Sequence, residues 1–326
     1  MKVALKDRYG PPEVVAVGEV ERPIPEANRV LVRVRAASVN RADLDGLLPR
    51  PSFVRLFIGL RRPRNRGVGL DVAGIVEAVG PEATRFKVGD PVFGDLSLFH
   101  DGAFAEYVCV SEAAFQPIPA GMSFEVAATL PHSAILAVQG LRRRDGRTIG
   151  PGDRVLVDGA SGNVGPFAVQ IAKARGAEVT GVCSPAKVDF VRSLGADHVL
   201  DYTTVDYTRT GKRYDWIIDT DSHHSLIAVR RALAPGGTYV TLGGTASPIL
   251  AALLLGPLLS RFGNRRLGLL TWWAPFRAED VATVLELVGT GTVRPVIDRR
   301  YPLAEVVGAL RWVNDGHARG KVIIEP

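Results

Sequence analysis

The sequence predicts an α/β protein in which a β-rich domain is joined to a doubly wound parallel sheet of six strands. Three observations lead to this fold class. The chain has 326 residues, 46% of them apolar, which is enough for about two domains. Short alternating strands fill its first third, and from about residue 151 apolar strands alternate with amphipathic segments of helical length. A glycine-rich loop at residues 159–165 joins one such strand to one such helix.

The β-rich part begins with a strand of period two, in which valines at 30, 32 and 34 alternate with Leu31, Arg33 and Arg35. Similar strands are expected at residues 72–79 and 107–110, separated by turn signals such as Val88-Gly89-Asp90. This pattern predicts a small barrel or sandwich.

The parallel sheet is expected from a second series of strands, which lie at residues 154–158, 178–183, 198–200, 216–219, 238–242 and 267–271. Helices are expected between them. The tail is expected to form a helix at 278–288, a strand at 293–297, a last helix and a terminal strand at 321–325. We expect this tail to pack on the first domain.

The most apolar stretch of the chain, residues 248–259, is interrupted by Gly256 and Pro257 and ended by Arg261. It is too short for a membrane span, which needs roughly 20 apolar residues. One interpretation is a buried helix or pocket wall. The other is a contact with a membrane surface or a second subunit.

Composition excludes several classes of protein. Cys109 and Cys183 lie in apolar runs without a CxxC pair, which excludes a disulfide framework or a structural zinc site. The first residues lack the apolar core of a secretory signal and the composition of a transit peptide, so a cytoplasmic location is expected. The net charge of +6 suits a binder of a polyphosphate cofactor as well as a weak nucleic-acid binder.

The loop at 159–165 has the spacing of a dinucleotide-binding loop between a strand and a helix. Ala160 takes the first glycine position, Gly162 lets the backbone approach a pyrophosphate, and Gly165 lets the helix lie close to the strand. The start of the helix offers N–H groups and a positive dipole end to phosphates. The alternative is a plain strand-to-helix turn.

The end of the second strand of this sheet indicates which nicotinamide nucleotide is bound. An NAD site usually has Asp or Glu there to hold the ribose hydroxyls, but this strand ends in Ser184, followed by Lys187. A hydroxyl and a cation at this place favour the 2′-phosphate of NADPH. Alternatively, Lys187 is only a solvated charge.

Several sequence blocks resemble the medium-chain dehydrogenase/reductase superfamily, in its zinc-free quinone oxidoreductase-like branch. Besides the loop, they are residues 36–40 (AASVN), 69–74 (GLDVAG), 86–90 (FKVGD), 102–107 (GAFAEY), 168–173 (AVQIAK) and 320–322 (GKV). The resemblance implies a GroES-like catalytic domain over residues 1–122 and 276–326 and a Rossmann domain over residues 123–275. It also implies an oxidoreductase that passes hydride from NADPH to an acceptor.

The same resemblance implies the site residues. The cofactor would contact the loop residues Ala160, Ser161, Gly162, Asn163, Val164 and Gly165, the 2′-phosphate residues Ser184, Lys187 and Tyr202, and Asn40 beside the nicotinamide. Asn40 and Asp43 are the catalytic candidates, although Asp43 could instead cap the following turn. The chain departs from relatives at Leu136, where many have Thr, and at Asp45, where some have Tyr.

The zinc ligands of metal-dependent relatives correspond to Asn40, Leu70 and Pro131, which are poor ligands or none at all. Without a metal to polarise it, the hydride acceptor must itself be electrophilic, such as a quinone or an α,β-unsaturated carbonyl. We therefore expect no metal.

Two further features are open to more than one interpretation. Six arginines and no acidic residue lie between Arg50 and Arg66, which fits either an anionic substrate such as a CoA thioester or a solvated loop. The pair His223-His224 has no third metal ligand at useful spacing and is interpreted as the start of a helix.

Two rival functions remain at this point. One is an NADPH-binding protein without catalysis, possibly an RNA binder, as zeta-crystallin-type members of the superfamily would permit. The other is alcohol oxidation, which needs a metal. For the enzyme, we expect a small-molecule substrate, no nucleic acid, no membrane span and, by analogy with relatives, a homodimer.

Overall fold

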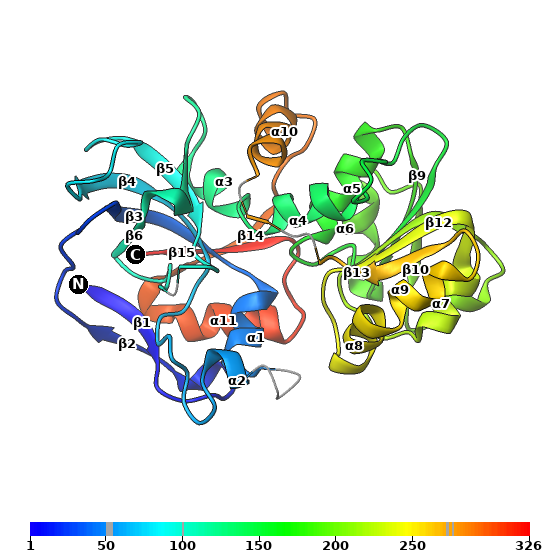
Figure 1. Cartoon of the computed structure of the whole chain (residues 1–326), viewed down its shortest axis with the longest axis horizontal. Coiled ribbons are helices and arrows are strands. Elements are labelled where there is room, and N and C mark those ends of the chain that lie inside the picture. Colours follow the sequence, from blue (N-terminus) through cyan, green and yellow to red (C-terminus); the bar gives the residue numbers. More distant parts are fainter. Residues whose placement is uncertain (50–54, 100, 272–273, 276) are drawn as a thin grey trace. The chain divides into compact units, whose positions relative to one another are not determined.

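The computed structural model describes residues 1–49, 55–99, 101–271, 274–275 and 277–326, and Figure 1 labels its elements. The chain forms two compact units. The first contains Met1–Ser133 and Ile297–Pro326, and the second contains Ala134–Val296.

These units differ from the expected domain bounds at 122/123 and 275/276, which stay a proposal. Helix α3 (Phe124–Thr129) falls in the first unit because it packs on β3 and β4. Helix α10 (Ala278–Gly289) falls in the second unit, where the amide of Gln139 donates to the carboxylate of Asp280 at 2.8 Å.

The described residues of the first unit form a seven-stranded sheet in the order β14-β15-β3-β4-β5-β7, with β6 also paired to β3. Its strands are β3 (Arg29–Val39), β4 (Asp71–Val79), β5 (Pro91–Asp95), β6 (Tyr107–Ser111), β7 (Phe115–Pro117), β14 (Ile297–Pro302) and β15 (Lys321–Glu325). A hairpin of β1 (Lys2–Lys6) and β2 (Val15–Glu19) and the helices α1 (Arg41–Leu47), α2 (Arg55–Ile58) and α11 (Val306–Asn314) complete it.

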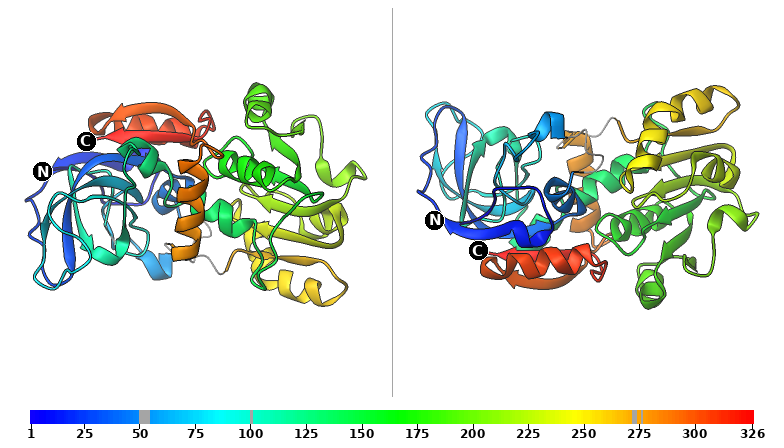
Figure 2. Two further views of the ribbon diagram at one scale, coloured as in Figure 1. Left: turned by 90° about the horizontal axis from the view of Figure 1, so that it is seen from above. Right: turned by 90° about the horizontal axis from the view of Figure 1, so that it is seen from below.

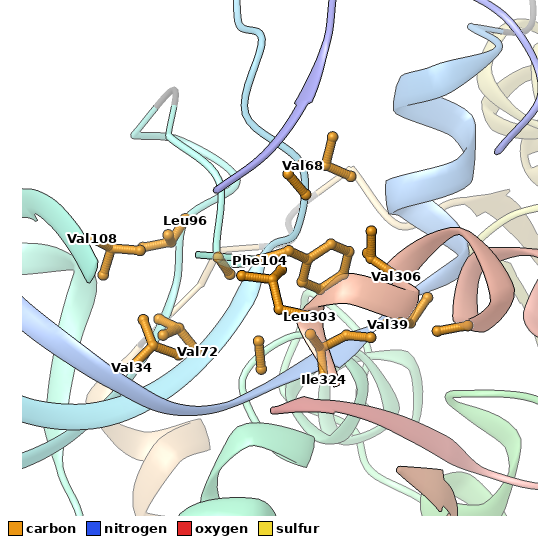
Figure 3. Close-up of a cluster of buried hydrophobic side chains, with 14 of the residues drawn as sticks. Val34, Val39, Val68, Val72, Leu96, Phe104, Val108, Leu303, Val306 and Ile324 are labelled. Carbon is orange, nitrogen blue, oxygen red and sulfur yellow. The ribbon is translucent and has the colours of Figure 1, made fainter. Parts of the chain in front are cut away.

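The core of this unit confirms the period of two in β3 over residues 32–35, whereas Leu31 departs from it because it is buried like Val30. Val32 and Val34 are buried, whereas Arg33 and Arg35 are exposed. The buried valines pack in one cluster with Phe104 of a loop and Val306 of α11 (Figure 3). Each fully buried side chain of this kind contributes about 1.5–3 kcal/mol, so this cluster joins the tail to the sheet.

The second unit confirms the predicted parallel sheet of six strands over its described residues. The order is β10-β9-β8-β11-β12-β13, and every pairing is parallel. The strands are β8 (Arg154–Asp158), β9 (Glu178–Cys183), β10 (His198–Asp201), β11 (Tyr214–Asp219), β12 (Leu233–Thr241) and β13 (Arg266–Leu269). The order turns back at β8, so β8 and the loop after it lie at the switch point where doubly wound sheets bind ligands.

Helices precede or connect these strands. They are α4 (Ser133–Gly140), α5 (Gly165–Ala174), α6 (Val188–Ser193), α7 (Leu226–Ala232), α8 (Ala246–Leu254) and α9 (Gly256–Arg261). The apolar stretch at 248–259 is therefore the pair α8 and α9, which contact each other and β13. Figure 2 shows this pair in yellow in two further views. In the described part of the chain no helix is long and apolar enough to cross a bilayer.

The strand expected at 293–297 is wrong, because β14 begins only at Ile297 and ends at Pro302. Pro295 has no N–H for a strand ladder. The backbone of Arg294 instead pairs with the side chain of Gln170, which accepts from its N–H at 2.8 Å and donates to its carbonyl at 3.1 Å.

Candidate functional site

The glycine-rich loop lies directly between β8 and α5, as predicted. The N–H of Ala160 donates to the carbonyl of Val182 on β9 at 2.9 Å, which holds the loop against the sheet. A Cβ on Gly165 would lie 2.3 Å from the carbonyl oxygen of Gly159 and 2.5 Å from the carbonyl carbon of Ala160. Only glycine therefore lets α5 start this close to the strand.

The loop also fits a dinucleotide on the side where Gly162 lies. A Cβ on Gly162 would contact only the carbonyl oxygen of Gly159, at 3.5 Å. A methyl group on residue 162 would therefore project into open space near the N-terminal end of α5, a helix of ten residues. Val164, which precedes α5, makes no side-chain capping hydrogen bond to it. The positive end of the helix dipole and the open backbone together suit a pyrophosphate.

The residue before the loop, Asp158, lies among other carboxyl groups. Asp158 on β8 stands in register with Asp219 on β11. Burial and the neighbouring carboxylates of Asp219 and Asp221 raise the pKa of Asp158 well above its ordinary value. A neutral Asp158 would not repel phosphates bound at the next residues.

The three residues expected at the 2′-phosphate come together at the carboxyl ends of β9 and β10. The N–H of Lys187 donates to the carbonyl of Ser184 at 3.0 Å, and the N–H of Tyr202 donates to the carbonyl of Cys183 at 3.2 Å. Asp201, also at this edge, accepts from the backbone and hydroxyl of Thr203. Burial raises the pKa of the Cys183 thiol to about 11, so it stays neutral beside them.

In the first unit, Asn40 belongs to a buried polar cluster around the ammonium of Lys321. Lys321 Nζ donates to Asn40 Oδ1 at 2.5 Å, to Asp71 Oδ2 at 3.1 Å and to Ser133 Oγ at 3.1 Å. The hydroxyl of Ser133 also donates to Asn40 Oδ1, at 3.0 Å. Because two donors hold the oxygen of Asn40, its side-chain amide is fixed in one orientation.

This cluster does not fit the catalytic zinc of metal-dependent relatives. A lysine ammonium contacts Asn40 Oδ1, the one atom at the three corresponding positions that could ligate a metal. Leu70 and Pro131 offer no ligand side chain. Among the described residues there is no group of three His, Cys, Asp or Glu side chains placed to hold a metal ion.

Asp43 is placed as a helix cap. Its Oδ2 accepts from the N–H of Asn40 at 2.6 Å, at the start of α1, and Asp43 is buried. Its Oδ1 is buried without a hydrogen-bond partner among the described residues. Burial, only partly offset by the N–H of Asn40, raises the pKa of Asp43 to about 7.

We expect Asp43→Asn to remove part of the pH dependence of stability. The folded pKa of about 7 lies above the ordinary 3.8, so the stability carried by the protonated acid is present at low pH. It is lost as the pH rises through the folded pKa. Between about pH 5 and pH 8 the wild type should lose about 2–3 kcal/mol more than Asp43→Asn. Urea unfolding at both pH values measures this difference.

Asp45→Asn is the matched control, since Asp45 lies on the same helix but is exposed and paired with Arg41 at 3.6 Å. It should follow the wild type. Equal pH dependence in the wild type and Asp43→Asn would contradict the assignment.

Sequence reasoning missed the partners of Asn40. Lys321 and Asp71 lie in two of the sequence blocks that carry the family resemblance, whereas Ser133 lies in none of them. It also missed His132. The ring Nδ1 of His132 lies 3.0 Å from Asp95 Oδ2, and its backbone N–H donates to Asp71 Oδ1 at 3.0 Å. Burial alone would lower the pKa of His132, but its hydrogen bond and ion pair with Asp95 raise it. The sequence signal that could have indicated this cluster is a charged residue beside an apolar strand segment, as at Lys321 and Asp71. Charged residues are rarely buried unless they are paired.

Several of the other candidate features have local partners. Of the arginines between 50 and 66, Arg50 lies outside the described residues, Arg55 stacks over Tyr9 at 4.8 Å and Arg66 pairs with Asp7 at 2.6 Å. His224 packs edge-on against Tyr207, and His223 lies 3.3 Å from Asp221.

The chain matches two family models, "Alcohol dehydrogenase GroES-like domain" over residues 26–120 and "Zinc-binding dehydrogenase" over residues 194–324. It is 32% identical over 351 residues to the mitochondrial NAD(P)H oxidoreductase RTN4IP1 of Mus musculus, covering 98% of this chain and 87% of that protein. It is 33% identical over 318 residues to the chloroplastic quinone-oxidoreductase homolog of Spinacia oleracea, covering 94% and 93%. The structure of the quinone oxidoreductase from Coxiella burnetii superimposes with a TM-score of 0.87 at 27% identity, covering 100% and 99%.

A GroES-like β unit with a Rossmann-type sheet of six parallel strands and a dinucleotide loop defines an oxidoreductase of the two-domain dehydrogenase class. The chain belongs to the medium-chain dehydrogenase/reductase superfamily, in its quinone oxidoreductase-like branch.

Proposed function

We propose that the protein transfers hydride from NADPH to a quinone or an α,β-unsaturated carbonyl compound without a catalytic metal. The observation that carries this proposal is the ammonium of Lys321 on Asn40 Oδ1, at a position that the family resemblance aligns with a zinc ligand of metal-dependent relatives. With no Lewis acid there, the acceptor must be electrophilic through its own conjugation.

The residues would divide the work as follows. The backbone at Gly162 and the start of α5 would hold the pyrophosphate, and Ser184, Lys187 and Tyr202 would hold the 2′-phosphate. When bound, the nicotinamide supplies the hydride.

Of the two residues expected to be catalytic, Asn40 would contact the ligand and Asp43 would position it. Lys321 and Ser133 hold Asn40 Oδ1, and Asn40 Nδ2 donates to the carbonyl of Ser38 at 3.5 Å, so the second Nδ2 hydrogen would be the one offered to a ligand. Asp43 would act through its cap on α1, as a positioning residue. A homodimer in the cytoplasm is part of the same proposal.

The test is NADPH oxidation by carefully metal-free protein, followed as the loss of reduced-nicotinamide absorbance with a panel of enones, enals and quinones. We expect steady turnover with at least one of these classes and no turnover with simple alcohols. Activity that requires added zinc would overturn the metal-free proposal. Tight NADPH binding without any turnover would instead support a non-catalytic role.

The preference for NADPH is tested by Lys187→Gln. Losing one charge-assisted contact to the 2′-phosphate should weaken NADPH binding about 10- to 100-fold and leave NADH binding nearly unchanged. Titration of both nucleotides measures the two dissociation constants. Lys212→Gln is the control, because exposed Lys212 precedes β11 at the amino ends of the parallel strands, whereas Lys187 follows β9 at their carboxyl ends. Equal weakening of both nucleotides by Lys187→Gln would contradict the assignment.

A further inference from the structure

An acidic residue lies beside the place where the proposed function puts the 2′-phosphate. Asp201 ends β10, and in the parallel pairing of β10 with β9 it stands opposite Cys183, the last residue of β9. Ser184 follows Cys183 directly, and Tyr202 follows Asp201. Because neighbouring strands lie about 5 Å apart and successive Cα atoms about 3.8 Å apart, the Cα atoms of Asp201 and Ser184 are within about 9 Å of each other. A carboxylate therefore borders a site that is expected to hold a phosphate.

The thiol of Cys183 shows that several charges of this edge lie close together. Burial, the largest cause, and the carboxylate of Asp201 raise the pKa of this thiol, whereas Lys187 and Arg192 lower it. Each of these three charges must lie near the thiol to act on it. Arg192 pairs with the carboxylate of Asp189 at 3.0 Å, and both side chains are exposed on α6. Lys187 is therefore the main cation that opposes Asp201 at this edge.

Asp201 also has a local structural role, and that role does not need its charge. Its Oδ1 accepts from the backbone N–H of Thr203 at 2.9 Å and from the hydroxyl of Thr203 at 2.8 Å. Asp and Asn side chains both form this kind of turn, so an asparagine would keep the two hydrogen bonds through its own Oδ1. The turn explains an acceptor oxygen at position 201 but not a negative charge there.

We propose that Asp201 is a specificity-determining residue that weakens the binding of NADPH relative to NADH. Its carboxylate opposes the attraction of Lys187 for the 2′-phosphate, a group that carries about 1.5 to 2 negative charges at pH 7. NADH has a hydroxyl group in place of this phosphate and does not meet the repulsion. The protein therefore binds both nucleotides, with a smaller preference for NADPH than Lys187 alone would give. This inference rests on the proposed function, because it takes the 2′-phosphate to lie at Ser184, Lys187 and Tyr202.

The test is titration of NADPH and NADH into the wild type and Asp201→Asn, followed by the fluorescence of the reduced nicotinamide. Removing the charge should tighten NADPH binding about threefold to tenfold and leave the dissociation constant of NADH within about twofold of the wild type. Salt at about 0.5 M should shrink the gain, because the effect is electrostatic. A merely structural role would change the binding of both nucleotides alike, without this salt dependence. Thermal unfolding without nucleotide checks the fold of the variant.

Asp215→Asn is the matched control, because Asp215 lies near the amino end of β11 and pairs with Arg154 at 3.1 Å. It should bind both nucleotides like the wild type. Unchanged or weaker NADPH binding in Asp201→Asn would overturn the inference, and so would an equal gain in NADH binding. In either case a selective loss of NADPH affinity in Lys187→Gln would leave the proposed function intact. If the wild type bound neither nucleotide, the proposed function and this inference would both be wrong.

Discussion

Replacing Lys321 with methionine is expected to lower the free energy of unfolding by about 3–5 kcal/mol, because it leaves the carboxylate of Asp71 buried without its cation. Lys321 and Asp71 are both fully buried, and their charged atoms lie 3.1 Å apart. Asp71 would keep only the hydroxyl of Ser38 and the N–H of His132, at 3.0 Å each. Urea unfolding with a two-state fit measures the change.

Lys173→Met is the matched control for this substitution. Lys173 also contacts a carboxylate, that of Asp197 at 2.8 Å, but the pair is partly exposed and should cost less than about 1 kcal/mol. Adding Asp71→Asn to Lys321→Met should restore part of the lost stability, since the unpaired charge is then gone. A loss below about 1 kcal/mol in Lys321→Met would contradict the role of this ion pair.

The second large effect is expected in the phosphate loop, where two glycines should respond oppositely to alanine. Gly165→Ala should lower the free energy of unfolding by about 3 kcal/mol or more, because its Cβ would meet fixed backbone atoms at 2.3–2.6 Å. Gly162→Ala should change stability by less than about 0.5 kcal/mol, because its Cβ meets one atom at an ordinary 3.5 Å.

For NADPH binding, in contrast to stability, we expect the larger direct effect from Gly162→Ala. The methyl group of Gly162→Ala would lie where the pyrophosphate approaches the backbone, and we expect NADPH affinity to fall about tenfold or more, which is about 1.4 kcal/mol. Titration of NADPH into folded protein measures this loss, and thermal unfolding without nucleotide checks the fold. If Gly162→Ala bound NADPH like the wild type, the phosphates would not rest at this loop.

The sequence alone determined the second unit and its loop, for a local reason. The six strands, their alternation with helices and the β8–loop–α5 connection depend on residues within short windows, where periodicity and glycine spacing act directly. The same local signals failed at residues 293–297, where apolar composition indicated a strand but Pro295 and the side chain of Gln170 determined otherwise.

Only the tertiary structure decided the environment of Asn40. Lys321 is 281 residues from Asn40 along the chain and 250 from Asp71, and nothing in their local sequences predicts that they meet. They meet because β15 pairs antiparallel with β3, with Val322 opposite Val39, which brings the start of one strand to the end of the other. Contacts between distant strands depend on the register of the whole sheet, whereas the glycine loop depends only on its neighbours.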